Sequence, residues 1–221
     1  MKFKSKLQYT SRRGKLAFVW DKYQSILTGK ILDVGSDENH LKNYLPSNVS
    51  YWGIGLGGNP DQVVDLSEGQ IPFEDRSYNC VLCLDVLEHL ENAHQIFDEL
   101  CRVSDKYVII SLPNSWRSLM LATLFGQNEE VRPLKYYGMP VNAEIDRHRW
   151  FLSYDEAAEF VKGRAKLNGY KVIQIDDHNA LKGWKYFAIR CWLMLFLLFD
   201  RTKVDRFMKG TMWAVIEKDS S

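Results

Sequence analysis

The chain has 221 residues, of which 46% are hydrophobic and 26% charged, and its formal net charge is +1. This length and balance fit one globular domain with a full core and exclude a disordered chain. The 29 basic residues are offset by 28 acidic ones, so no basic surplus indicates a nucleic-acid partner. Four scattered cysteines predict no disulfide framework, and no apolar signal segment follows Lys2, Lys4 and Lys6. We therefore expect a cytoplasmic protein.

Short apolar runs alternate with helical stretches along the first half of the chain, which is the pattern of βαβ units around a parallel sheet. Three helical segments are expected here, over residues 12–27, 41–45 and 87–102. The last of them has its apolar positions at helical spacing. The expected strands cover residues 30–34, 49–54, 62–66, 79–84 and 106–112.

The second half of the chain is less regular. Turn residues interrupt residues 115–149, which predicts a loop-and-helix insertion over the carboxyl ends of the strands. Ser153 and Glu156 form a capping-box pattern that starts a helix ending near Asn168. Two further strands are expected over residues 170–175 and 211–218. We expect residues 1–221 to form a single α/β domain.

Cys80 and Cys83 form a C-x-x-C pattern, but they lie within an apolar run that predicts a buried strand. Residues three apart on a strand face opposite sides of the sheet, so the two thiols could not share an ion. No second cysteine pair completes a zinc set. We expect both cysteines to be structural, and we expect no metal site.

Ligands of open parallel sheets bind beyond the carboxyl ends of the strands. Four pieces of this sequence fall at such ends, namely residues 33–36, 55–58, 65–66 and 84–89. The glycine-rich piece at 55–58 lacks the Lys-Ser/Thr pair of a phosphate-binding loop and opens no helix. The position of these pieces predicts one ligand site at a single edge of the sheet.

Three segments, ILDVGS, DLSEGQIPFEDRSYNCVLCLDVLEHLEN and YVIISLPN, carry a family resemblance. Residues 31–114, which contain them, resemble the core of class I S-adenosylmethionine-dependent methyltransferases. The resemblance implies a Rossmann-like α/β fold, with a mostly parallel seven-stranded sheet and helices on both faces. It implies S-adenosylmethionine as the cofactor, bound by residues 1–114, and an acceptor-binding half over residues 115–221.

The matched positions have separate physical roles. A side chain at Gly35 would collide with the cofactor's methionine moiety, and Asp33 would orient the loop or meet the cofactor's ammonium group. Asp65 would accept from the adenine amine, and Asp85 would face the sulfonium; the alternative for both is a helix or turn cap. The expected cofactor-binding residues are Asp33, Gly35, Ser36, Asp37, Gly55, Leu56, Asp65, Leu66, Asp85 and Val86.

Three positions depart from the family pattern. Asp37 and Asn39 stand where the first loop usually carries further glycines, and Gly55 stands where an acid usually takes both ribose hydroxyls. Loss of that acid would cost about 1.5–3 kcal/mol, or roughly ten- to a hundredfold in affinity. Either Asp37 or a water replaces the contact, or the site is degenerate and the chain is a non-catalytic binding or assembly module.

His89 and His148 are the candidate catalytic residues. Histidine suits general-base catalysis at neutral pH if the acceptor is a hydroxyl. His148 lies in a segment that resembles the H-x-x-F-(S/T) entry of methyltransferases acting on sugars and small metabolites. The alternatives are ordinary packing for His89 and a solvated turn for His148. We expect methylation, at oxygen, of a small-molecule or glycan-like acceptor.

Residues 184–199 are unusually apolar. The uninterrupted apolar run is shorter than the roughly 20 residues that a membrane-spanning helix needs. The segment fits a helix packed on the protein or across a homodimer contact, which we favour, or a helix lying at a membrane surface. A peripheral membrane contact therefore stays open as an alternative.

Overall fold

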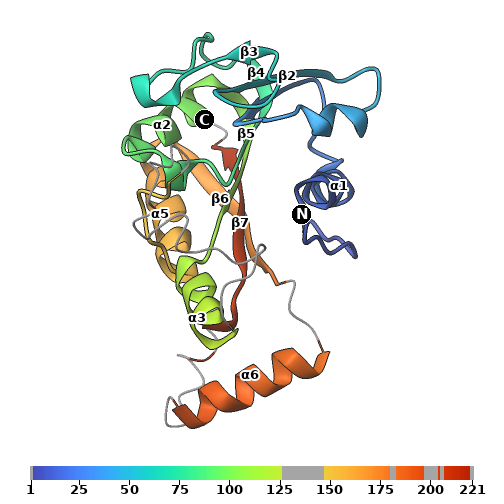
Figure 1. Cartoon of the computed structure of the whole chain (residues 1–221). Coiled ribbons are helices and arrows are strands. Elements are labelled where there is room, and N and C mark those ends of the chain that lie inside the picture. The colour runs from blue at the N-terminus through green and yellow to red at the C-terminus, as the bar shows by residue number, and fades with distance from the viewer. Residues whose placement is uncertain (1, 126–146, 180–182, 197–203, 205–206, 220–221) are drawn as a thin grey trace.

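The computed structural model describes residues 2–125, 147–179, 183–196, 204 and 207–219, and these residues are built around a seven-stranded β-sheet. Its strands are β1 Lys30–Val34, β2 Ser50–Gly55, β3 Gln62–Val63, β4 Tyr78–Leu84, β5 Ser104–Leu112, β6 Tyr170–His178 and β7 Thr211–Lys218. They lie in the order β3-β2-β1-β4-β5-β7-β6 (Figure 1). Neighbours from β3 to β5 are parallel, whereas β7 is antiparallel to both of its neighbours. The mostly parallel sheet predicted from the sequence is confirmed.

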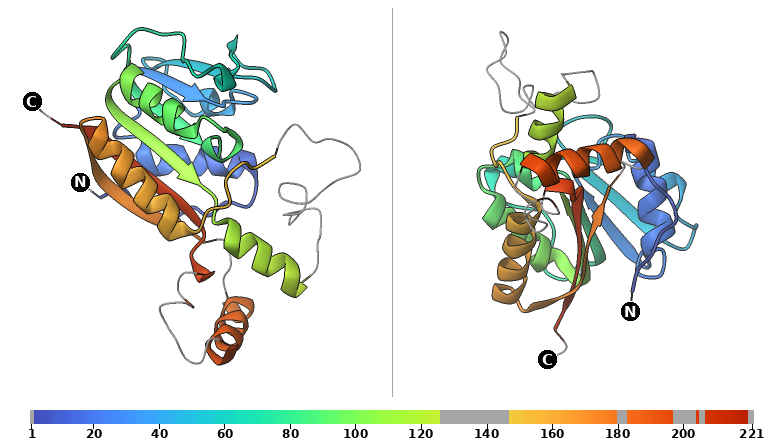
Figure 2. Two further views of the ribbon diagram at one scale, coloured as in Figure 1. Left: turned by 90° about the vertical axis from the view of Figure 1, so that its left-hand side faces the viewer. Right: turned by 90° about the horizontal axis from the view of Figure 1, so that it is seen from below.

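Helices cover both faces of this sheet, as the views in Figure 2 show. Helix α1 (Arg12–Tyr23) packs its apolar residues into the core on one face, together with the N-terminal Phe3. Helices α2 (Ala93–Val103) and α5 (Tyr154–Leu167) pack into the core on the other face. Two cores separated by one sheet make a three-layer α/β arrangement, so the predicted fold class is confirmed.

The two cysteines of the C-x-x-C pattern lie on opposite faces of β4. Cys80 belongs to the core under α1, and Cys83 belongs to the core under α2 and α5. Burial raises the pKa of both thiols above the ordinary range, which keeps them protonated. The prediction that both cysteines are structural is consistent with this placement, and the two sulfurs do not share a site.

The first residue predicted for the helix over residues 87–102 is wrong. The chain forms a short 3-10 helix, η3 (Leu87–His89), and α2 begins only at Ala93. Leu90, between the two helices, has an extended backbone. Asn92, the residue before α2, donates a side-chain hydrogen bond to the carbonyl of Leu66. The break matters because it places His89 in a tight turn directly after β4.

Smaller differences occur elsewhere. The expected helix at 41–45 is a 3-10 helix, η1 (His40–Asn43), and β3 is cut short before the 3-10 helix η2 (Leu66–Glu68). The insertion predicted after β5 begins with α3 (Ser115–Phe125), and residues 126–146 of it lie outside the described residues. The capping box at Ser153 and Glu156 is formed as predicted, because each side chain bonds the other residue's backbone N–H.

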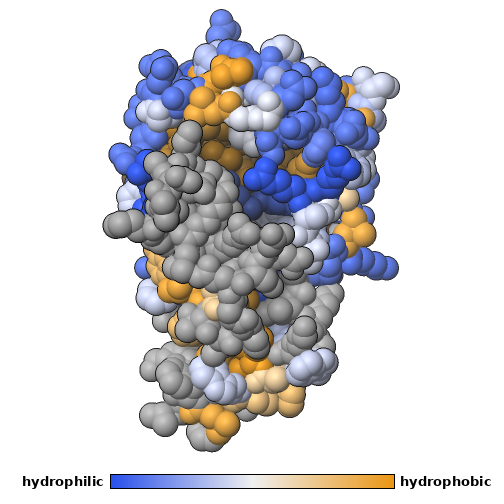
Figure 3. Space-filling model, viewed as in Figure 1, coloured by the Kyte–Doolittle hydropathy of each residue, from blue (hydrophilic) through white to orange (hydrophobic). Residues whose placement is uncertain are grey.

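Helix α6 (Gly183–Phe196) lies at one end of the molecule, beyond the sheet (Figure 1). One side of it is packed on protein, because Ile189 and Leu193 are buried in a small cluster with residues of α3. Its other side exposes Trp184 and Phe187, and Figure 3 shows apolar surface at this end. Residues 197–199 of the predicted segment lie outside the described residues. Within the described part, no helix has the length and apolar character that crossing a membrane requires.

The loop after β1 keeps the backbone of a glycine-rich loop without its glycines. Gly35, Asp37 and Asn39 all have left-handed conformations, with φ values of 80°, 54° and 53°. Aspartate and asparagine enter this region more readily than other side chains do. The two departures at residues 37 and 39 therefore preserve the loop's path.

The loop after β2 packs against the loop after β1. The Asn59 N–H donates to the carbonyl of Asp37 at 2.8 Å, and the Asn39 amide donates to the carbonyl of Asn59 at 3.0 Å. A Cβ at Gly58 would lie closer than 3.0 Å to backbone atoms of Asp37, and Gly58 has φ +75°. The glycine-rich piece is needed for close loop packing.

Gly58→Ala should destabilise the protein by more than about 2 kcal/mol, because a left-handed alanine and a backbone clash both oppose it. Gly57→Ala is the matched control, since a Cβ there meets no atom within 4 Å. The control should change the free energy of unfolding by less than about 0.5 kcal/mol. Chemical denaturation of both variants measures the difference, and equal stabilities would contradict the packing described for the two loops.

Candidate cofactor and acceptor site

Gly35 lies where the ends of β1 and β4 meet. Its N–H donates to the carbonyl of Ile54 at 2.7 Å, and the residue is exposed although Val34 and Ser36 on either side are buried. A Cβ at Gly35 would lie closer than 3.0 Å to the Val86 side chain. A Cβ at residue 35 is therefore excluded by the Val86 side chain of the protein itself. The sequence had predicted that the cofactor's methionine moiety would exclude it.

Asp33 faces the core under α1 and anchors the loop after β1 through Tyr51. Its carboxylate accepts the Tyr51 hydroxyl at 2.8 Å, and the same hydroxyl lies 3.3 Å from the Asn39 side-chain oxygen. Burial raises the pKa of Asp33 to about 6. Of the two roles predicted for Asp33, these contacts support the one that orients the loop.

The ends of β2 and β3 supply the next predicted residues. Gly55 ends β2, and a Cβ there would meet only ordinary contacts, so no steric conflict explains the missing acid. Leu56 is exposed beside it. The Asp65 carboxylate caps η2 by accepting the Ser67 N–H at 2.9 Å, and this bond lowers the pKa of Asp65. The cap role is thus present, while Leu66 is buried directly after it.

Asp37 was predicted as a substitute for the missing ribose acid. Its carboxylate forms an ion pair with Arg12 at the start of α1. Both side chains are substantially exposed, so the pair contributes little to stability and can open. Binding of a ribose by Asp37 would require exchange of this partner.

Asp85 at the end of β4 is held by two residues that the sequence analysis did not single out. The Lys15 ammonium, from α1, lies 2.6 Å from one carboxylate oxygen and 3.0 Å from the Ser111 hydroxyl. The Ser111 hydroxyl donates to the other carboxylate oxygen at 2.6 Å. Asp85 has φ +57°, a conformation that is uncommon outside glycine. Val86, and not Asp85, occupies the N-cap position of η3, so Asp85 does not cap that helix.

Electrostatics keep Asp85 ionised. Burial raises the pKa of its carboxyl group, but the charge of Lys15, the hydrogen bonds from Lys15 and Ser111, and the charge of His148 together outweigh burial. The net result is a pKa below the ordinary value. The end of β4 therefore carries a fixed negative charge at neutral pH.

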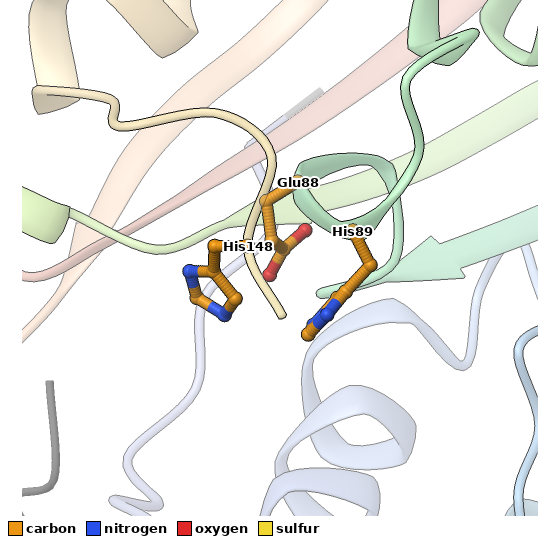
Figure 4. Close-up of side chains that lie close together, drawn as sticks. All are labelled: Glu88, His89 and His148. Atoms are coloured by element: carbon orange, nitrogen blue, oxygen red, sulfur yellow. The ribbon is translucent and has the colours of Figure 1, made fainter. Parts of the chain in front are cut away.

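The two predicted catalytic histidines lie together. The ring centroids of His89 and His148 are 4.5 Å apart with the rings nearly perpendicular. Figure 4 shows the carboxylate of Glu88 between them, with Glu88 and His89 in η3 and His148 in the segment that leads to α5. Residues far apart in the sequence are thus joined beside the end of β4.

Hydrogen bonds to the main-chain carbonyls of Glu88 and Leu90 fix this juxtaposition. The Arg149 N–H donates to the carbonyl of Glu88 at 2.7 Å, and the Trp150 indole donates to the carbonyl of Leu90 at 2.7 Å. Glu88 is only 1% exposed, and the sequence analysis missed it as a site residue. The sequence offers one signal for Glu88, which is its charge directly after an apolar strand, because a buried carboxylate usually has a partner.

Comparisons with known proteins identify the family and the fold of this chain. A family model described as a methyltransferase domain matches residues 5–175, and no curated protein matches the chain. A methyltransferase of Archaeoglobus fulgidus, described as S-adenosylmethionine-dependent, has a similar structure, with a TM-score of 0.57, 14% identity, and coverage of 94% of this chain and 95% of that one.

Two further solved structures share the fold. Magnesium protoporphyrin IX methyltransferase from Synechocystis, solved with bound S-adenosylhomocysteine, matches with a TM-score of 0.55 and 15% identity over 94% of this chain and 84% of that one. The [4+2]-cyclase SpnF matches with a TM-score of 0.56 and 11% identity over 95% and 82%. At these identities the structural matches establish the fold, whereas the family model covers most of the chain. The chain belongs to the methyltransferase-domain family, whose cofactor is S-adenosylmethionine.

Proposed function

We propose that the protein transfers a methyl group from S-adenosylmethionine to a hydroxyl of a small-molecule or glycan-like acceptor. The observation that carries this proposal is the pair of imidazoles, His89 and His148, beside the ionised Asp85 at the carboxyl edge of the sheet. An imidazole suits deprotonation of a hydroxyl at neutral pH. The balanced charge of the chain favours a small acceptor over nucleic acid.

The residues at this edge fit the cofactor. Gly35 offers exposed backbone for the methionine moiety, Asp85 offers negative charge for the sulfonium, and the Asp65–Leu66 turn offers polar backbone for the adenine. When bound, S-adenosylmethionine supplies the methyl group, and its carbon–sulfur bond breaks with the electron pair kept by sulfur. Without an acid at Gly55, we expect an affinity roughly ten- to a hundredfold below that of a site with the full ribose contact.

The chain's own residues would then position the acceptor and remove its proton. Lys15 and Ser111 hold Asp85 in place and ionised, which fixes the negative charge opposite the sulfonium. The acceptor hydroxyl lies between Asp85 and the histidines, so that its oxygen attacks the methyl carbon while its proton passes to an imidazole nitrogen. Holding the two reacting atoms in line supplies most of the rate enhancement.

Asp85→Asn should weaken binding of S-adenosylmethionine by roughly ten- to a hundredfold, because it removes a charge-assisted contact of about 1.5–3 kcal/mol. Asp105→Asn is the matched control, since Asp105 is exposed near the opposite, amino end of β5. It should leave the affinity unchanged. Titration calorimetry with S-adenosylmethionine and S-adenosylhomocysteine measures both, and equal affinities of the two variants would contradict the proposed role of Asp85.

A non-catalytic binding or assembly module is the second candidate. Two observations favour it: residue 55 is a glycine where the family usually has an acid, and Asp37, the proposed substitute, forms an ion pair with Arg12. The same calorimetry separates the candidates. No detectable binding of either nucleoside at about 1 mM would support the module and reject the enzyme.

We also propose that α6 rests against a membrane surface, with homodimerisation as the competing outcome. Its exposed side carries Trp184, Phe187, Trp192 and Leu195, while Ile189 and Leu193 already fill the protein-facing side. Tryptophan is favoured where apolar and aqueous media meet. Such a contact suits a lipid-linked acceptor.

Liposome co-sedimentation tests this contact. The Trp184→Ser, Phe187→Ser double variant should lose binding to vesicles of phosphatidylcholine and phosphatidylglycerol, because two large apolar groups leave the interface. Trp52→Ser removes an exposed tryptophan on β2 and should bind as the unchanged protein does. A dimer on size exclusion that the double variant abolishes, without vesicle binding, would reject the membrane contact.

A further inference from the structure

We propose that Glu88, His89 and His148 bind a divalent transition-metal ion. The three residues each present a ligand atom, and these atoms all lie within 4.8 Å of one another. Figure 4 shows the two imidazole rings on either side of the carboxylate. Two imidazoles and one carboxylate form a set that recurs in zinc and non-haem iron sites.

The geometry requires only side-chain adjustment. Ligand atoms about 2.1 Å from a tetrahedral ion are roughly 3.4 Å from one another. In this structure the ligand atoms lie up to 4.8 Å from one another, which exceeds the tetrahedral separation by little more than 1 Å. Rotation about side-chain torsions can close this difference. The backbone is already fixed, because the Arg149 N–H bonds the carbonyl of Glu88 and so holds the His148 segment against η3.

The charges around the cluster favour a cation. Glu88 is buried, and the ionised Asp85 lies three residues before it at the end of β4. The Lys15 ammonium is bonded to Asp85 and to Ser111. The Arg149 guanidinium forms an ion pair with Glu91 at 3.3 Å. A divalent ion would add a direct ligand contact to this buried carboxylate.

The donor set also selects the class of ion. Imidazole nitrogens suit zinc, iron, cobalt and nickel, whereas magnesium and calcium prefer sites made of oxygen alone. Three protein ligands leave at least one coordination position open, which is the arrangement of catalytic rather than structural sites. The open position is where the acceptor could bind.

This part of the inference rests on the proposed function. A bound ion lowers the pKa of a hydroxyl that coordinates it, so the hydroxyl proton can leave to water. The acceptor oxygen is then held next to the methyl donor, and the methyl carbon–oxygen bond forms as the carbon–sulfur bond breaks. In that case the imidazoles act as neutral ligands and do not themselves take the proton.

Zinc and cobalt(II), added alone to chelator-treated protein, test the site directly. Titration calorimetry should show one ion per chain, and cobalt should give visible absorption of a low-symmetry site. Glu88→Gln and His148→Asn should each weaken binding at least tenfold, because each removes one of three ligands. His94→Asn is the matched control, since His94 lies on α2 and contacts Trp150 and Phe160, outside the cluster. It should bind zinc as the unchanged protein does.

Circular dichroism of each variant shows whether it has folded. If Glu88→Gln or His148→Asn does not fold, His89→Asn provides another ligand variant. Absence of zinc and cobalt binding at about 100 µM, or binding that the ligand variants leave intact, would overturn the site.

Calorimetry with S-adenosylmethionine keeps the two proposals apart. Cofactor binding without any zinc binding rejects the metal site alone, and zinc binding without cofactor binding rejects the methyltransferase alone. If both bind, methyl transfer should disappear on chelation and return with zinc. Transfer that survives chelation would reject the ion's part in the reaction and support the imidazole base.

Discussion

The contact among Lys15, Asp85 and Ser111 is the interaction on which the arrangement of the site depends. It joins α1 to the ends of β4 and β5 by three hydrogen bonds of 2.6–3.0 Å. This ion pair is only partly buried, with the Asp85 side chain 40% exposed, and such a pair contributes little net stability once desolvation is counted. Its consequence is positional: it fixes the Asp85 charge and holds its backbone in the left-handed conformation from which η3 starts.

The rest of the site follows from the parallel sheet. Because parallel strands present their carboxyl ends at one edge, the loops after β1 and β2 and the turn after β4 meet there. The left-handed residues Asp37 and Asn39 let the first loop close against the second. The turn at η3 brings Glu88 and His89 to the segment that carries His148, so a second group of polar side chains adjoins the first.

The sequence predicted the number and chain order of the strands because most of them are apolar runs with clear breaks, whereas β3 ends at Val63, short of its expected bound, and β6 extends to His178, beyond its expected bound. It did not predict that α2 starts only at Ala93, because the apolar spacing continues through residues 87–92 while the Asn92 side chain donates to the carbonyl of Leu66. Lys15 was also missed, although it shares a helix face with the buried Phe18 and Val19. A lysine at helical spacing among core residues signals a buried partner. Glu88 was missed because its grouping with His148, which lies 60 residues further along the chain, arises only in the fold.

The central claim is that the cofactor occupies the carboxyl ends of β1, β3 and β4. Hydrogen exchange measured by mass spectrometry, with and without saturating S-adenosylhomocysteine, tests it most directly. We expect slower exchange in peptides that contain Gly35–Ser36, Asp65–Leu66 and Asp85–Val86, and unchanged exchange at the amino end of β5. Bound nucleoside that leaves these three peptides unprotected would contradict the account.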